Sequence, residues 1–123
     1  HSALMASLEG YLNLTENRDE AQSVLNIVSE NRGRRVLSVA SDGKVEEYEL
    51  QYVVTFSAID NSKETEVSSQ MILPRQSVTL KRIYQFDESA VLAIEAEESD
   101  LYRAMANDAA RQIARRLDVA ITR

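Results

Sequence analysis

The sequence predicts an α+β fold: a two-layer sandwich in which two helices cover one face of a mainly antiparallel sheet. Two patterns predict it. In EYELQYVVTFSA, residues 47–58, every second residue from Tyr48 onward is apolar, which is typical of a strand with one buried face. In segments 3–12 and 99–117 the apolar residues recur every three or four positions, which predicts a helix with one apolar stripe near each end of the chain. Both stripes can pack against the same apolar sheet face.

Composition narrows the class of protein. The 123 residues are expected to form a single domain, residues 1–123, and they contain no run of 18 apolar residues that would predict a membrane span. The formal net charge of −6 argues against general nucleic-acid binding, which needs a basic surface. The lack of cysteine excludes disulfides and thiolate metal sites. The single histidine, His1, is interpreted as the remnant of an expression tag rather than as a catalytic residue.

The first predicted helix begins abruptly. Leu4, Leu8 and Leu12 share one helical face, but no capping sequence precedes them, so the segment is interpreted as the later part of a helix that starts upstream. Gly10 is expected to end it in the left-handed conformation. The polar residues 15–22 then form a loop.

The strands come next. Residues 24–39 are predicted to be the first, with a bulge or bend at Gly33. The dipeptide Asp42-Gly43 predicts a tight turn into the return strand, roughly 45–59.

After a turn at 59–64, two further extended segments are expected. Residues 65–73 and 76–86 are separated by Pro74 and could be two strands or one long bent strand. Because proline lacks a backbone donor, we expect Pro74 at a bulge or on an edge strand.

The C-terminal helix is predicted over 99–117, with Ser99 as its N-cap. Acidic residues gather at its start and arginines at its end, which suits the helix dipole. Tyr11 and Tyr102 are expected at the rims of the helices.

Chemical motifs are scarce. The three glycines form no phosphate-binding loop, and the chain offers no Ser-His or Cys-His pair unless His1 is native. The carboxylate clusters at 46–49 and 95–98 lack the pattern of a calcium loop and are interpreted as solvated charge. No metal, cofactor or catalytic residue is therefore predicted.

The basic residues suggest more. Several lie on the predicted strands and turn, at Arg32, Arg34, Arg35, Lys44, Arg75, Lys81 and Arg82. Some of them could form a local cationic patch suited to phosphate or carboxylate groups, or they could be ordinary solvated charges paired with nearby glutamates.

Three segments, in this order, resemble the LptE family, the lipopolysaccharide (LPS) assembly lipoproteins of Gram-negative outer membranes. DGKVEEYELQYVV (42–54) is similar to the family's hairpin, with a turn glycine, Glu-Tyr and an alternating strand. LPRQSVTLKRIYQFDESAVLA (73–93) resembles its strand ending in Arg-x-aromatic-x-aromatic-Asp and followed by a Leu-Ala turn. EESDLYRAMANDAARQIARRL (97–117) resembles its terminal helix, with paired alanines and Arg-Arg-Leu.

The resemblance implies a sheet of about four strands under two helices. It therefore implies that this sequence is N-terminally incomplete: a first strand, the start of the first helix and a lipid-bearing cysteine would lie upstream. It also implies a non-catalytic protein on the periplasmic side of the outer membrane, which plugs the β-barrel of the LPS translocon LptD, assists its assembly and binds LPS.

LPS contacts implied by the resemblance are Lys44, Arg34 and Arg35, followed by Lys81 and Arg82. The chain departs from the family where relatives have an arginine in the turn that here reads Ser41-Asp42-Gly43, and where they have a basic residue in place of Ile94 and Glu95. It is also longer between Asp60 and Ile72.

Two other functions stay open on the residues alone. One is a cytoplasmic α+β module that binds a small ligand. The other is an enzyme that uses carboxylates in a cleft between the helices, which a deep pocket with convergent carboxylates would support.

Overall fold

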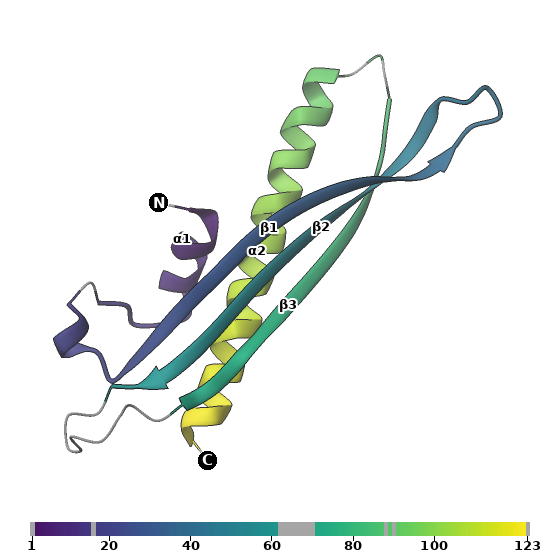
Figure 1. Cartoon of the computed structure of the whole chain (residues 1–123). Coiled ribbons are helices and arrows are strands. Elements are labelled where there is room, and N and C mark those ends of the chain that lie inside the picture. Colours follow the sequence, from purple (N-terminus) through teal and green to yellow (C-terminus); the bar gives the residue numbers. More distant parts are fainter. Residues whose placement is uncertain (1, 16, 62–70, 88, 90, 123) are drawn as a thin grey trace.

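The computed structural model describes residues 2–15, 17–61, 71–87, 89 and 91–122. Its elements are helix α1 (Ala3–Glu9), a short 3-10 turn (Arg18–Glu20), the strands β1 (Ser23–Val39), β2 (Val45–Asp60) and β3 (Met71–Gln85), and helix α2 (Val91–Thr122). The strands form one antiparallel sheet in the order β1-β2-β3. Both helices lie on the same face of this sheet (Figure 1), which confirms the predicted two-layer α+β sandwich.

The central strand β2 follows its alternating sequence. The side chains of Leu50, Tyr52, Val54, Phe56 and Ala58 are buried under the helices. The residues between them, such as Val53 and Thr55, are only partly buried on the opposite face. We call that opposite side the open face, because neither described helix covers it.

The helices complete the core with small and branched side chains. Leu4 and Leu8 of α1 are buried against α2. On α2 the buried residues recur at helical spacing and include many alanines, which let the helix lie close to the sheet: Met105, Ala106, Ala109, Ala110, Ile113 and Leu117. Tyr102 is also buried, so its predicted rim position is wrong, whereas Tyr11 is exposed as expected.

Helix α2 begins two turns earlier than predicted. It starts at Val91, so Ser99 lies inside the helix and is not its N-cap. The earlier start is stabilised by packing, since Ile94 is buried in the core and Glu98 accepts a hydrogen bond from the hydroxyl of Tyr84 at 2.9 Å. At about 1.5 Å per residue the helix is roughly 48 Å long, close to the length of the strands that it covers.

Both predictions about the ends of α1 need correction. The helix has an N-cap: the Oγ of Ser2 accepts a hydrogen bond from the backbone N–H of Met5 at 3.2 Å. It ends before Gly10 as predicted, but Gly10 has φ −76° and is right-handed. Among the described residues, positive φ occurs only at Gly43, in the predicted turn.

The first strand bulges, but not at Gly33. Gly33 pairs regularly with Gln51, and the register shifts lie between Ile27 and Ser29 and again after Val36. The extra residue at Val28 changes which positions face the helices, since a one-residue offset moves side chains to the other side of a sheet. Before the bulge, odd-numbered residues face the helices; Ile27, for example, lies opposite the buried Phe56. After the bulge, even-numbered residues face the helices; Arg34, for example, lies opposite the buried Leu50.

The last strand is continuous through Pro74. A register shift places Phe56 opposite Gln76 and Ala58 opposite Leu73, so Pro74 lies in a bulge on an edge strand. The predicted pair of segments is thus one strand from Met71, and the expected strand residues 65–70 lie outside the described residues.

Candidate functional site

The five cations predicted to contact LPS lie on different sides of the sheet. Arg34 on β1 and Arg82 on β3 both lie opposite Leu50 of β2. Because Leu50 is buried under the helices, both arginines also face the helices. Arg35 and Lys81 lie opposite Glu49 and Gln51, on the open face, and Lys44 ends the turn between β1 and β2. The structure therefore does not gather all five into one patch.

Arg34 lies in an aromatic cluster at the base of the β1–β2 hairpin. Its guanidinium is 4.5 Å from the ring centroid of Tyr48 and its Nη1 is 3.5 Å from Glu98. Tyr48 stacks on Tyr84 at 5.7 Å and meets Phe86 edge-on at 5.3 Å. Hydrogen bonding with Tyr84 and the charge of Glu98 raise the pKa of Arg34, although partial burial opposes this. About half of the side chain is exposed, so the fixed cation can still meet an external anion.

Arg32, which was predicted as a possible member of a cationic patch but not as an LPS contact, is held in the same way. The guanidinium of Arg32 is 4.9 Å from the ring centroid of Tyr102. The Tyr102 hydroxyl donates a hydrogen bond to the carbonyl of Gly33 at 3.0 Å, which joins α2 to β1. Arg32 and Arg34 lie two residues apart in ENRGRR, so the sequence predicts that they share one side of β1. Which side they face depends on the bulge at Val28.

The open face is largely polar, although Val53 and the exposed Ile83 also lie on it, and several of its polar side chains are paired. Arg35 Nε donates to Glu49 Oε1 at 2.8 Å, and the Ser38 hydroxyl donates to Glu47 Oε1 at 2.8 Å. The hydrogen bond from Arg35, helped by the charge of Lys81, lowers the pKa of Glu49, while desolvation opposes it. The charged side chains on this face lie close to opposite charges, and the residues around them have neutral hydroxyl and amide side chains.

The β1–β2 turn projects beyond the helices (Figure 1). It is closed by hydrogen bonds from Ala40 N–H to the Lys44 carbonyl at 2.8 Å and from Gly43 N–H to the Ala40 carbonyl at 2.9 Å. Gly43 has φ 84°, a conformation that glycine adopts without strain. Next to the turn, Val36 and Val39 leave about half of their side chains exposed, so the hairpin end offers both apolar and cationic groups.

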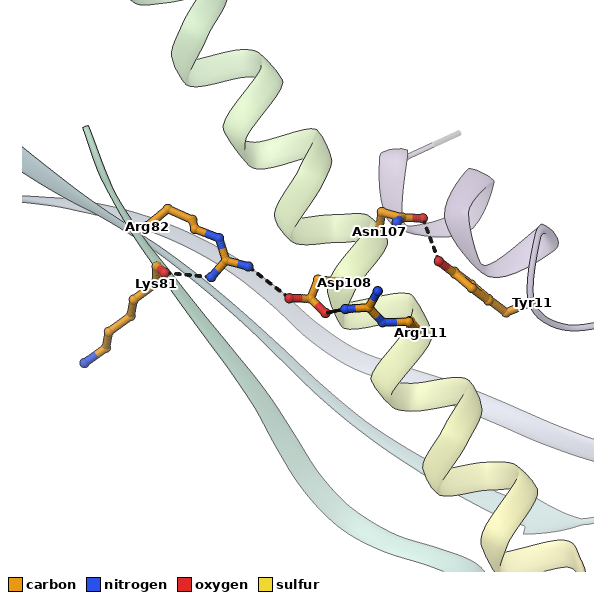
Figure 2. Close-up of polar contacts among 6 residues, drawn as sticks. All are labelled: Tyr11, Lys81, Arg82, Asn107, Asp108 and Arg111. Atoms are coloured by element: carbon orange, nitrogen blue, oxygen red, sulfur yellow. Dashed lines mark hydrogen bonds and ion pairs between the residues drawn. The ribbon is translucent and has the colours of Figure 1, made fainter. Parts of the chain in front are cut away.

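Arg82 is bound to the long helix. Figure 2 shows its guanidinium reaching Asp108, with Arg82 Nη2 3.0 Å from Asp108 Oδ2, while the side chain of Lys81 leaves β3 in another direction. Arg111 pairs with the other oxygen of the same carboxylate. Burial would raise the pKa of Asp108, but Arg111 and Arg82 outweigh it and hold that pKa below its usual range.

The hollow between the two helices lacks the convergent carboxylates that the enzyme alternative required. It holds about 550 Å³ and is lined by Ala3, Ala6, Ser7, Gly10, Tyr11, Arg103 and Asn107, none of which is a carboxylate. Within the described ranges, no three acidic or histidine side chains are grouped so that they could hold a metal ion. None of the described helices is long and apolar enough to cross a membrane.

The comparisons with known proteins agree with this geometry. The model of the family described as "LptE: Lipopolysaccharide-assembly" matches residues 1–117. The comparison with curated proteins gave no match.

Three solved structures share the fold. Rare lipoprotein B from Shewanella oneidensis superposes with a TM-score of 0.78 at 23% identity, covering 99% of this chain and 89% of that one. A minor lipoprotein from Acinetobacter baumannii gives a TM-score of 0.73 at 28% identity, with coverages of 96% and 83%. Lipoprotein B from Nitrosomonas europaea gives 0.71 at 30% identity, with coverages of 94% and 74%.

Proposed function

The chain belongs to the LptE family of lipopolysaccharide-assembly proteins, and from this membership we propose that it plugs the LptD barrel at the outer membrane and binds LPS there. The observation that supports this most is the family match over residues 1–117. In this proposal the protein acts without catalysis, on the periplasmic side, as a lipoprotein like the three solved relatives.

The open face supports the plug. A hydrated barrel lumen would meet a surface of paired charges and hydroxyls, such as Arg35 with Glu49 and the hydrogen-bonded Thr55 and Ser77, at 2.8 Å between their hydroxyl oxygens. Such groups keep their hydrogen bonds in water, so docking would demand little desolvation of unpaired charge.

The hairpin end supports an LPS contact. Arg34, Arg35 and Lys44 lie toward this end with exposed apolar side chains, which suits a ligand that has both phosphates and acyl chains. Arg82 and Lys81 rank lower because they lie on β3, across β2 from Arg34 and Arg35, and do not adjoin the turn. The net charge of −6 would repel LPS at long range, so binding would depend on these local cations.

Co-purification tests the plug. The full-length tagged protein is expressed in its own host, and the outer membranes are extracted in detergent. A stoichiometric LptD band is expected. Recovery of the protein from the soluble fraction without LptD would contradict the proposal and limit the relationship to the fold.

Charge reversal tests the LPS contact separately. We expect Arg34→Glu, Arg35→Glu and Lys44→Glu, each made singly, to weaken binding of purified LPS. Arg103→Glu is the matched control, because it makes the same charge change on α2, where Arg103 pairs with Asp100 and lines the hollow beside α1. Equal loss in the control would show that the effect comes from net charge and not from the hairpin.

A further inference from the structure

The side of the molecule where α2 meets the edge strand β3 is cationic. Strand β3 contains Arg75, Lys81 and Arg82 and no acidic residue. The facing part of α2, residues 108–117, contains three arginines and one acidic residue, Asp108. In a chain with a net charge of −6, this is a strong local excess of positive charge.

The three α2 arginines line a hollow in the surface of that helix. It holds about 250 Å³ and is lined by Asp108, Arg111, Gln112, Arg115 and Arg116. It is a feature of the α2 surface near β3, so it is distinct from the β1–β2 hairpin to which the proposed LPS contact belongs.

Neutral groups hold one of these arginines in place. Arg116 Nη1 donates to Gln76 Oε1 at 2.9 Å and to the Ser77 carbonyl at 3.3 Å, and its guanidinium is 5.8 Å from the ring centroid of Phe56. Because none of these partners is charged, the guanidinium of Arg116 is oriented without a carboxylate partner among the described residues. Arg115 makes no hydrogen bond or ion pair with any residue in the described part of the chain.

The one carboxylate at the hollow is already occupied. Both oxygens of Asp108 accept from arginines, one from Arg82 and one from Arg111 (Figure 2). Among the residues that line the hollow there are three arginines and one aspartate, which leaves an excess of two positive charges there. An incoming anion would therefore meet excess guanidinium groups, while the repulsion from Asp108 is offset by its own partners.

We propose that this hollow binds a phosphate group. Guanidinium forks match the oxygens of phosphate, and a phosphate monoester brings nearly two negative charges in one compact group. A single carboxylate would leave part of the excess positive charge unbalanced. The phosphate could belong to a free anion or to a lipid headgroup, and the proposal does not depend on the LPS role.

Inorganic phosphate is the first probe. It is titrated into the whole protein against chloride at constant ionic strength, and the Nε–Hε NMR signals of the arginines are followed. We expect saturable shifts for Arg111, Arg115 and Arg116. Arg115→Glu should weaken the apparent affinity about tenfold or more, since a hydrogen bond to a charged group is worth about 1.5–3 kcal/mol. Arg103→Glu makes the same charge change on the same helix and should alter the affinity less than about twofold.

Two results would overturn the proposal. One is the absence of saturation in the wild-type protein, or equal weakening by Arg103→Glu, since either means that phosphate only screens the surface. The other is a response of the same arginine signals to a glutamate-rich peptide but not to phosphate, which would make the flank a protein-binding surface. If phosphate binds, flotation with phosphatidic acid vesicles against phosphatidylcholine vesicles distinguishes a lipid headgroup from a free anion as its source.

Discussion

Neighbouring valines on β2 allow a direct test of the two-layer packing. Val54 has no exposed surface and lies under the helices, whereas Val53 lies on the open face between Asn31 and Thr79. Replacing either by alanine removes the same two carbon units and lowers strand propensity by the same amount. The difference between the two variants therefore measures what covers each face.

The magnitude follows from burial. At Val54, losing two buried carbon units costs about 0.8 kcal/mol each, and the void adds about 1 kcal/mol because the surrounding core relaxes only partly. We expect Val54→Ala to lower the free energy of unfolding by about 2–3 kcal/mol, out of a total of roughly 5–15 kcal/mol for a domain of this size. Val53→Ala should cost less than about 1 kcal/mol, because water already reaches that side chain.

Urea unfolding followed by far-UV circular dichroism measures both variants, with the m-value checked for constancy. Sedimentation at the same protein concentration shows whether self-association covers the open face. If Val53→Ala costs as much as Val54→Ala in a monomeric sample, the packing of both helices on one face is refuted.

Three further predictions concern single polar contacts. Tyr52→Phe should lower the free energy of unfolding by about 1–2 kcal/mol in urea, because the buried Tyr52 hydroxyl donates to Glu30 Oε1 at 2.8 Å and phenylalanine keeps the ring; no change would mean that this bond is not formed in solution. The folded-state pKa of Asp108 is lowered, so its contribution to stability is complete above its unfolded pKa, near 3.8, and is lost as the pH falls through the folded value. Wild-type protein should thus lose more free energy of unfolding than Asp108→Asn between pH 7 and pH 2 in urea melts. Equal losses in the two proteins would argue against the ion pairs of Asp108 with Arg82 and Arg111. Arg35→Ala should raise the pKa of Glu49, followed by carboxyl NMR chemical shifts, and an unchanged titration would exclude Arg35 as the main cause.

The sequence predicts the fold well where the pattern is local. The alternation in 47–58 gives both the strand and its buried face, and Asp42-Gly43 gives the turn. The start of α2 is missed because it depends on burial of Ile94 against distant parts of the chain, which no local capping pattern shows.

The candidate site is less predictable because its partners are distant in sequence. Glu98 of α2 pairs with Arg34, and Asp108 of α2 pairs with Arg82, each across the two layers. The sequence around either arginine gives no sign of these carboxylate partners. Whether these residues bind LPS stays a prediction.

The bulge at Val28 also affects how relatives should be compared. Inserting or deleting one residue in β1 moves each following side chain to the other face of the sheet. Arg34 would then lie on the open face and Arg35 would face the helices, although neither residue type has changed. An alignment that matches arginine with arginine can therefore pair a side chain stacked on tyrosine with one that faces solvent. Homologous positions in this strand are better assigned by the β2 residues with which they pair than by residue identity.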